Sequence, residues 1–352
     1  MEKLKLNETP VRTSKNFNIN NIKLENIQLP EKVEKFENVS ITGEGTKIQN
    51  ITDSINLVYG LDEVLTNQVK KQANQKLNIT IDSKVNKETQ IEFKFDSENA
   101  TLIEDIEITA NKDTRSTIII KYLSNDKVQA CHNGILRVNA KQNSNINIII
   151  VNLMNTKSNN FLAIENNFEE NAKINYTIVD FGGKNSITNY YSNLQGDNCD
   201  NQLNAIYLGK ENQIFDLKYI GELRGKKSNI DIEVQGALKD TSKKHFKGTI
   251  DFKKGCKKAT GNENEACMLL SDTAKSIALP MLLCSEEEVE GNHSSSAGKI
   301  GEKELFYIMS RGFELKEAMK LMVRARFNQI LEKIENEELR DEILQEIDKR
   351  LD

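Results

Sequence analysis

The feature that most constrains this chain is a long central stretch, from about residue 76 to residue 290, that reads as short strands with almost no helical periodicity. β-Branched residues recur there at period two and are interrupted by Gly, Asn and Asp, a pattern typical of strands and turns. The clearest strands are expected at Asn145–Met154, Ile174–Phe181, Asn201–Leu208, Gln213–Ile220, Ile230–Leu238 and His245–Phe252. So long a run of strands must form a sandwich, a barrel or a β-solenoid. Asn-rich turns and strand intervals of roughly 11–28 residues favour the solenoid, but no clean repeat is visible, so the pattern alone leaves these architectures open.

The N-terminal segment, residues 1–75, is rich in Asn and Lys and has weak periodicity. Pro10 and Pro30 interrupt any long element there. We expect a partly helical or irregular segment, with one short helix over residues 61–72.

The C-terminal part, residues 301–352, shifts to a period of 3.6 residues, which predicts a small helical domain. Its expected helices are Glu302–Arg311, ended by Gly312, then Glu314–Ile334, and a third helix capped by Asn336. The sequence therefore predicts a β core over residues 76–300, followed by a helical domain.

Composition narrows the possible functions. The chain has 29% charged residues and a formal net charge of −5, with both signs interspersed, so it offers no basic patch for nucleic acid. It has no tryptophan and 6% aromatic residues, which argues against a carbohydrate-cleaving groove lined by aromatic platforms. No apolar run approaches ~18 residues and no leader is evident, so we expect a cytoplasmic protein that does not engage a membrane. The five cysteines are expected to be free thiols.

Several motifs follow one another in the C-terminal half. Gly236–Leu238 reads GAL and Phe246–Phe252 reads FKGTIDF. Leu269–Ala274 reads LLSDTA and is followed by His293, and Gly301–Gly312 reads GEKELFYIMSRG. In this order they resemble the G-A-L, F-x-G-x-I, L-L-S-D-x-A … H and D-x-x-x-L-F-Y-L-x-S-R-G segments of the SufB/SufD family of iron–sulfur cluster assembly proteins.

The resemblance, strong over residues 201–330 and faint before them, implies a fold and a role. The fold would be mainly β, a right-handed parallel β-helix with a small C-terminal helical domain and a short N-terminal segment. The role would be that of a non-catalytic scaffold for a transient iron–sulfur cluster. The implied partners are the ATPase SufC on the C-terminal helices, a cysteine desulfurase as sulfur source, and a second chain of this family, identical or not. The chain has no G-x-x-x-x-G-K-[ST] loop, so ATP hydrolysis is expected in SufC.

Iron and sulfide need thiolate, imidazole or carboxylate ligands, and the segment 265–293 holds all three. The candidate ligands are Cys267, Cys284, His293, Glu265 and Glu290. We expect Cys267 and His293 to lie within coordination reach of one another, or of their mates across a dimer axis. The competing interpretation is that the two cysteines are small buried hydrophobic residues.

The sequence departs from the scaffold type at this segment. SufB members carry Glu-His-Glu where this chain has Asn292-His293-Ser294, so only the histidine is kept. Their cysteine aligns with Glu265, two residues before Cys267 and therefore on the same strand face. A SufD-like structural partner that binds no cluster stays open as an alternative.

The C-terminal helices carry more large apolar side chains than a small hairpin can bury. The candidate SufC contacts are Leu305, Phe306, Tyr307 and Met309, with Arg311 at the rim. Helices dock into grooves through apolar anchors at such spacings. The alternative is that these residues only cover the end of the β body.

A third interpretation is a β-helix enzyme that acts on polysaccharide through paired acids. It would need clustered carboxylates and aromatic stacking along one groove. It would also leave the L-F-Y-x-x-S-R-G helix unexplained.

Overall fold

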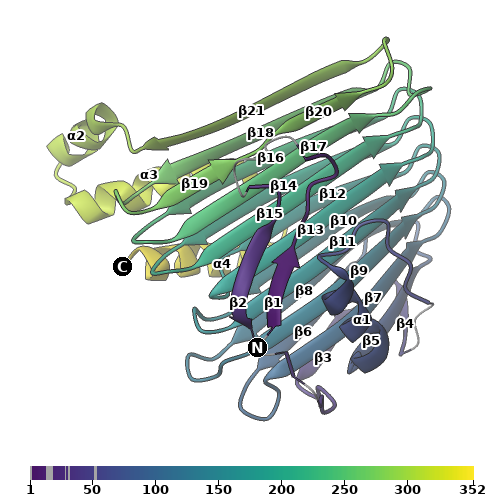
Figure 1. The fold of residues 1–352 in the computed structure, drawn as a ribbon, viewed down its shortest axis with the longest axis horizontal. Coiled ribbons are helices and arrows are strands. Elements are labelled where there is room, and N and C mark those ends of the chain that lie inside the picture. The colour runs from purple at the N-terminus through teal and green to yellow at the C-terminus, as the bar shows by residue number, and fades with distance from the viewer. Residues whose placement is uncertain (1, 13–18, 28, 31, 51–53) are drawn as a thin grey trace.

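The computed structural model describes residues 2–12, 19–27, 29–30, 32–50 and 54–352. It is mainly β, with 50% strand and 15% helix, and forms a parallel β-solenoid of about eight turns. Each turn of the solenoid contributes one strand to each of two facing sheets (Figure 1). The expected solenoid is therefore confirmed, and the sandwich and barrel are not.

Strands that follow one another in sequence lie in opposite sheets. The nine-stranded sheet contains, in spatial order, β21 (Glu290–Lys299), β18 (Thr260–Leu269), β16 (Asn229–Leu238), β14 (Asp200–Gly209), β12 (Lys173–Asp180), β10 (Asn145–Leu153), β8 (Arg115–Ser124), β6 (Glu88–Phe95) and β3 (Val39–Gly43). The ten-stranded sheet contains β19 (Lys275–Ala278), β17 (Lys243–Phe252), β15 (Ile214–Leu223), β13 (Asn185–Leu194), β11 (Asn159–Phe168), β9 (Cys131–Ala140), β7 (Thr101–Ala110), β5 (Gln75–Ile81) and β4 (Thr46–Gln49), with β20 (Met281–Cys284) also on β17. The six strands expected from the sequence are β10, β12, β14, β15, β16 and β17, with ends shifted by at most three residues.

The interior of the solenoid is built from stacked apolar rows. Side chains alternate along a strand, so every second residue points inward. Ile118, Ile148 and Tyr176 are opposite one another in the parallel register and are fully buried. Rows of this kind exclude water from the space between the sheets and hold successive coils together.

The Asn-rich turns stack into ladders on the outside of the coils. Asp113, Asn143 and Asn171 all adopt positive φ, a conformation that Asn and Asp tolerate better than most residues. Asn143 Nδ2 donates to Asp113 Oδ1 at 2.7 Å, and Asn171 Nδ2 donates to Asn143 Oδ1 at 3.0 Å. Stacked partners are 26 residues apart for Asn193 and Asn167 but 31 apart for Asn264 and Glu233. This variation in coil length is why the sequence shows no clean repeat.

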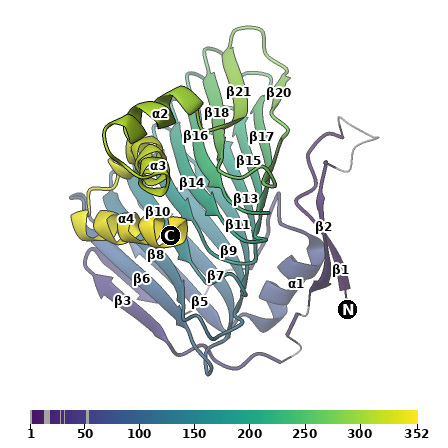
Figure 2. The ribbon, with the colours of Figure 1, turned by 90° about the vertical axis from the view of Figure 1, so that its left-hand side faces the viewer.

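The C-terminal helices α2 (Glu302–Ser310), α3 (Leu315–Leu331) and α4 (Glu337–Leu351) lie on the outer side of the nine-stranded sheet (Figure 2). That outer face carries apolar residues such as Ile149 and Val151, which pack with Val323, Phe327 and Ile343. The three helices predicted from the sequence are confirmed. The Asn336 cap is confirmed as well, since its side chain accepts a hydrogen bond from the backbone N–H of Leu339 at 3.0 Å.

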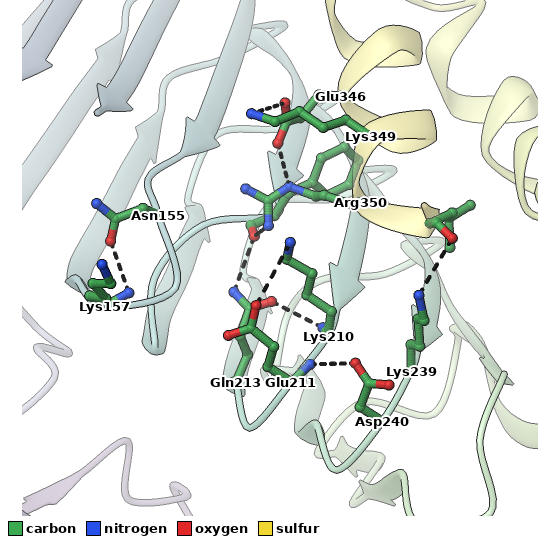
Figure 3. Close-up of polar contacts among 12 residues, drawn as sticks. Asn155, Lys157, Lys210, Glu211, Gln213, Lys239, Asp240, Glu346, Lys349 and Arg350 are labelled. Carbon is green, nitrogen blue, oxygen red and sulfur yellow. Dashed lines mark hydrogen bonds and ion pairs between the residues drawn. The ribbon is translucent and has the colours of Figure 1, made fainter. Parts of the chain in front are cut away.

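Arg350 anchors α4 to the edge of the solenoid (Figure 3). Its guanidinium is buried, lies 5.9 Å from the ring centre of Phe181, and donates to the backbone carbonyls of Phe181 and Met154. Its Nε donates to Glu346 Oε1 at 2.7 Å, within the same helix. One side chain thus satisfies two buried carbonyl groups and fixes the end of the chain.

The N-terminal segment covers the opposite face, over the ten-stranded sheet (Figure 2). Its β1 (Glu2–Leu6) and β2 (Ile22–Ile27) pair antiparallel, and its α1 (Glu63–Gln72) is the helix expected at 61–72. Leu65 and Val69 pack with Ile103 and Phe161 of the sheet. β3 and β4 extend both sheets by antiparallel pairing, so regular β structure begins before residue 76. In the described part of the chain, no helix combines the length and apolar character needed to cross a membrane.

Candidate functional site

β18 lies next to the last strand of the nine-stranded sheet (Figure 1) and carries polar side chains at inward positions. Opposite Ile232 of β16, the inward position of β18 is Glu263, and opposite Val234 it is Glu265. Both glutamates are buried. We call Glu263, Glu265 and Cys267, together with their neighbours Lys244 and Tyr207, the β18 polar cluster.

Glu265 is the best-satisfied member of the β18 polar cluster. Its Oε1 lies 2.8 Å from Lys244 Nζ of β17, and neither side chain is exposed. The Tyr207 hydroxyl donates to the same oxygen at 3.0 Å, and the Ser295 hydroxyl of β21 donates to Oε2 at 2.8 Å. A buried carboxylate needs such partners because its desolvation is otherwise unfavourable.

Cys267 lies two residues beyond Glu265 on the same inward face and is 4% exposed. Burial raises the pKa of its thiol, an effect opposed by the Lys244 ammonium and by hydrogen bonding with Tyr207 and Ser276. The thiol is therefore protonated at neutral pH in this conformation. Its neighbours are polar, although it borders the aliphatic core, so it is not a cysteine enclosed by hydrocarbon alone.

Glu263 is the least satisfied member of the β18 polar cluster. It is 2% exposed, and no described residue offers a hydrogen bond to either of its carboxyl oxygens. Burial, followed by the nearby charge of Glu265, raises the pKa of its carboxyl to about 8. The carboxyl lies against Gly248 of β17, where a Cβ atom would come within 2.2 Å of Glu263 Cδ. Glu263 thus extends into space that any side chain at position 248 would need.

His293 stands at the solvent-facing rim of this interior. In the β18–β21 register it is directly opposite Glu263, and it shares a strand face with Ser295, which contacts Glu265. It is exposed because β21 is the edge strand of the sheet. The imidazole is therefore accessible from solution at the point where the polar interior ends.

One chain does not bring Cys267 and His293 within coordination reach. Cys267 is opposite Ala297, four positions along β21 from His293. At ~3.3 Å per residue, this offset corresponds to about 13 Å along the strand. The register of the last coil, rather than the spacing in sequence, decides this separation.

The other two predicted ligands lie outside the interior. Cys284 is exposed at the end of β20, opposite Phe252, and its Sγ donates to the backbone carbonyl of Glu286 at 3.0 Å. Glu290 is exposed at the start of β21, opposite Thr260. Among the described residues, no three His, Cys, Asp or Glu side chains are gathered so that they could hold a metal ion. Glu265 and Cys267 are thus brought together by the fold, whereas Cys284 and Glu290 stand apart from them.

Sequence reasoning missed Glu263, Lys244 and Tyr207. Glu263 could have been found from the sequence, because it lies two residues before Glu265 and four before Cys267. In a strand these three side chains point to the same face. No local signal pairs Lys244 or Tyr207 with β18, since they come from other coils of the solenoid.

A second candidate surface lies on α2, which has no buried residue. Phe306 is 74% exposed, Tyr307 and Met309 are also exposed, and Leu305 is half-buried. Arg311 lies over the Tyr307 ring and donates to its hydroxyl at 3.1 Å. Large apolar side chains that stay in water on one helix are typical of a protein-binding surface.

Comparison with known proteins assigns the family. A family model described as the SufBD core domain of SUF system FeS cluster assembly matches residues 93–326, which is more than half of the chain. The chain belongs to the SufB/SufD family. It is therefore a member of a family of iron–sulfur cluster assembly proteins, as the sequence motifs predicted.

Relatives within the SufB/SufD family are distant. The iron–sulfur cluster assembly protein SufD of Bacillus subtilis is 24% identical over 180 residues, which cover 51% of this chain and 41% of the relative. A SufBD family protein of Pyrococcus horikoshii is 32% identical over 167 residues, 47% of this chain and 36% of the relative. SufD of Escherichia coli is 21% identical over 237 residues, 67% of this chain and 56% of the relative. The chain thus spans between 36% and 56% of the length of these SufB/SufD relatives.

The donor set of the β18 polar cluster fits the chemistry of the SufB/SufD family. Cys267 offers a thiol, Glu263 and Glu265 offer carboxyl oxygens, and His293 offers an imidazole at the rim. Iron and iron–sulfur clusters are held by these ligand types.

Proposed function

We propose that this chain is a scaffold subunit on which a nascent iron–sulfur cluster is built, from iron and from sulfur supplied by a cysteine desulfurase. The observation that carries the proposal is the β18 polar cluster, in which a thiol, two carboxyl groups and an ammonium lie together in the interior beneath the edge strand. Buried charged groups seldom stabilise a fold better than apolar residues of similar volume would. A thiol, two carboxyl groups and an ammonium at neighbouring interior positions are better explained by binding chemistry.

In this proposal each residue of the site has a role. The Cys267 thiolate accepts the outer sulfur of the desulfurase's persulfide and becomes a persulfide itself, while the desulfurase cysteine leaves as a thiolate. The Lys244 ammonium lowers the pKa of the Cys267 thiol and so opposes the larger effect of burial. Glu265 and His293 bind iron from the inner and outer side of the last coil. Cys284 and Glu290, which flank the turn into β21, serve as outer ligands as iron enters.

The proposed scaffold pairs with a second SufB/SufD-type chain, here as a homodimer. β21 is the edge of the nine-stranded sheet, and an edge strand offers unpaired backbone groups to a partner. Such pairing would set two copies of His293 near one interface. The partner's ligands could then complete a site for which Cys267 and His293 of one chain lie too far apart.

The proposed energy source is the ATPase SufC, bound to α2. The exposed Phe306, Tyr307 and Met309 and the half-buried Leu305 provide the apolar contact, and Arg311 provides a polar one. The proposed setting is the cytoplasm, where thiols remain reduced.

Anaerobic reconstitution tests the scaffold proposal. The full chain is incubated with ferrous iron and sulfide, desalted, and measured for visible absorption and for bound iron and sulfide. Cys267→Ala should lose most of the absorption. The matched control is Cys199→Ala, a buried thiol in another coil that donates to the backbone carbonyl of Glu169, and it should behave as wild type. Equal absorption in both variants would remove Cys267 from the proposal.

A SufD-like structural partner without its own cluster is the second candidate function. It is favoured by one observation, that Cys267 and His293 are four register positions apart. If the wild-type chain holds no iron or sulfide but still co-purifies with SufC and a second family member, this candidate is the correct one. The family assignment favours either assembly role over a polysaccharide-acting enzyme.

A further inference from the structure

A polar cavity of about 480 Å³ lies on the outer side of the nine-stranded sheet, next to the turn that joins α3 to α4. Strands β8, β10, β12 and β14 line one side of it, and residues 333–336 of the turn line the other. A cavity of this size can hold a small molecule or a long side chain, since small-molecule sites span ~300–1,000 Å³. Half of its described lining residues carry carboxamides, namely Asn86, Asn147, Asn175, Gln202, Asn204 and Asn336. The cavity therefore selects a ligand through hydrogen bonds rather than through apolar contact.

Two hydrogen bonds tie the α3–α4 turn to the sheet and fix the walls of this cavity. Lys333 Nζ donates to Asn204 Oδ1 of β14 at 2.6 Å. Asn336 Nδ2 donates to Glu88 Oε1 of β6 at 2.9 Å, and Asn336 Oδ1 caps α4. The lining groups are thus positioned before a ligand arrives, which lowers the entropy that binding costs.

The amide N–H groups along the strand side of the cavity are already used within the protein. Asn175 Nδ2 donates to Asn147 Oδ1 at 2.9 Å, and Asn147 Nδ2 donates to Thr117 Oγ1 at 3.4 Å. Gln202 Nε2 donates to Asp200 Oδ1 at 3.3 Å. The strands therefore offer a ligand few donors.

The acceptors of the same side chains remain free. Within the described part of the chain, Asn175 Oδ1 and Gln202 Oε1 receive no hydrogen bond, and both residues line the cavity. Thr177 is only 6% exposed, yet its hydroxyl, which also lines the cavity, has no described partner. The carboxylates of Glu88 and Glu335 add negative charge to the lining. The cavity thus suits a cation that is rich in N–H donors.

We propose that this cavity binds a guanidinium group, carried either by a free small molecule or by an arginine of a partner protein. A guanidinium is positively charged, has only donors, and presents them in a fixed planar fork. Lys333 is the one ammonium among the described lining residues, and it competes for the same acceptors through its bond to Asn204. The cavity shares no lining residue with the β18 polar cluster, so the inference goes beyond the proposed scaffold function and does not depend on it.

Calorimetric titration of the full chain tests the guanidinium proposal. One pair of probes is agmatine and N-carbamoylputrescine, in which an uncharged urea replaces the guanidinium. The other pair is a capped Gly-Arg-Gly tripeptide and the same tripeptide with citrulline in place of arginine. The guanidinium member of at least one pair should bind roughly tenfold or more tightly than its urea counterpart, because hydrogen bonds to a charged group are the stronger ones. Preference for agmatine would identify a free small molecule as the source, and preference for the tripeptide a protein partner.

Three variants locate the bound probe. Thr177→Val removes the buried hydroxyl and should weaken binding of the preferred guanidinium probe roughly tenfold. Lys333→Met removes the competing ammonium and frees Asn204 Oδ1, so it should strengthen binding, a gain that a merely structural role would not produce. Glu338→Gln is the matched control, because Glu338 is an exposed carboxylate of α4 that does not line the cavity. It should bind as wild type does.

The proposal is overturned if neither guanidinium probe binds, or if the urea probes bind equally well. It is also overturned if Thr177→Val and Lys333→Met both bind the probe as wild type does, because the guanidinium would then lie elsewhere. Should Thr177→Val fail to fold, Lys333→Met decides alone, since Lys333 is at an exposed position. None of these results bears on cluster reconstitution, so the two proposals succeed or fail separately.

Discussion

Lys244 Nζ of β17 lies 2.8 Å from Glu265 Oε1 of β18, and neither side chain has exposed surface. The two strands belong to opposite sheets, so this ion pair crosses the interior of the solenoid. Tyr207, from a coil further back, donates to the same oxygen. The ion pair is therefore expected to stabilise the fold, and it also holds in place Glu265, one of the proposed iron ligands.

Lys244→Met should destabilise the fold by ~3–5 kcal/mol, because Glu265 would be left as an uncompensated buried charge. The double variant Lys244→Met/Glu265→Leu should recover most of this loss, since it removes both charges at similar volume. Urea denaturation of the single and double variants measures the difference. Lys243→Met, on the exposed face of the same strand, is the control and should change little. Equal midpoints for Lys244→Met and the control would show that the ion pair is unimportant for stability.

Arg350→Met should destabilise the fold by ~1–3 kcal/mol, because the carbonyl groups of Phe181 and Met154 each lose a charged donor. Each carbonyl keeps only a neutral donor, the Gln213 side chain and the Gly183 backbone N–H respectively. The loss should appear first as faster proteolysis within α4, since that helix is fixed by this side chain (Figure 3). Lys349→Met, at the neighbouring exposed position, is the control. If α4 is cleaved at the same rate in both variants, Arg350 does not anchor the helix.

Asp180 should make stability depend on pH. It is buried in the interior, where it accepts hydrogen bonds from Ser186 and Asn152, and burial raises its pKa from 3.8 to about 6. Between pH ~4 and ~6 the unfolded chain therefore releases a proton that the folded chain retains. The free energy of unfolding falls as pH rises through this window, by roughly 3 kcal/mol at most, and stays lower above it.

Asp180→Asn should remove this contribution, so its stability relative to wild type should rise between pH 4 and pH 7. Chemical denaturation of both proteins across that range gives the difference at each pH. Asp126→Asn, at an exposed turn position, should run parallel to wild type. A difference between wild type and Asp180→Asn that is constant with pH would contradict the assigned shift.

Phe306→Ala should leave stability within about 0.5 kcal/mol of wild type, because its side chain is largely in solvent. If α2 docks on SufC, the same change should cost ~2 kcal/mol of binding, which is a roughly thirtyfold loss of affinity. Titration of SufC against the immobilised chain measures it. Phe327→Ala, at a buried position of α3, should show the opposite profile, with a stability loss of ~3–5 kcal/mol. Unchanged SufC affinity in Phe306→Ala would move the docking surface elsewhere.

The sequence by itself determined what depends on near neighbours along the chain. The 3.6-residue period and the Asn336 cap located α3 and α4, because helix geometry and capping are decided within a few residues. The alternation in β18 placed Glu265 and Cys267 on one face for the same reason. The antiparallel β1 and β2 were not predicted, because their strand character depends on packing over the sheet rather than on a local pattern.

Only the tertiary structure decided which residues of different coils meet. That Lys244 pairs with Glu265, and that His293 lies opposite Glu263 and not Cys267, follows from the register between coils. Register depends on how many residues each turn contains, and paired residues of successive coils here are 26 to 32 residues apart, as for Asn159 with Asn185 and Lys243 with Lys275. An added or missing residue in one turn shifts every later pairing, and nothing local to a strand records that shift. The ligands could therefore be named from the sequence as residue types, but their partners could be named only from the folded chain.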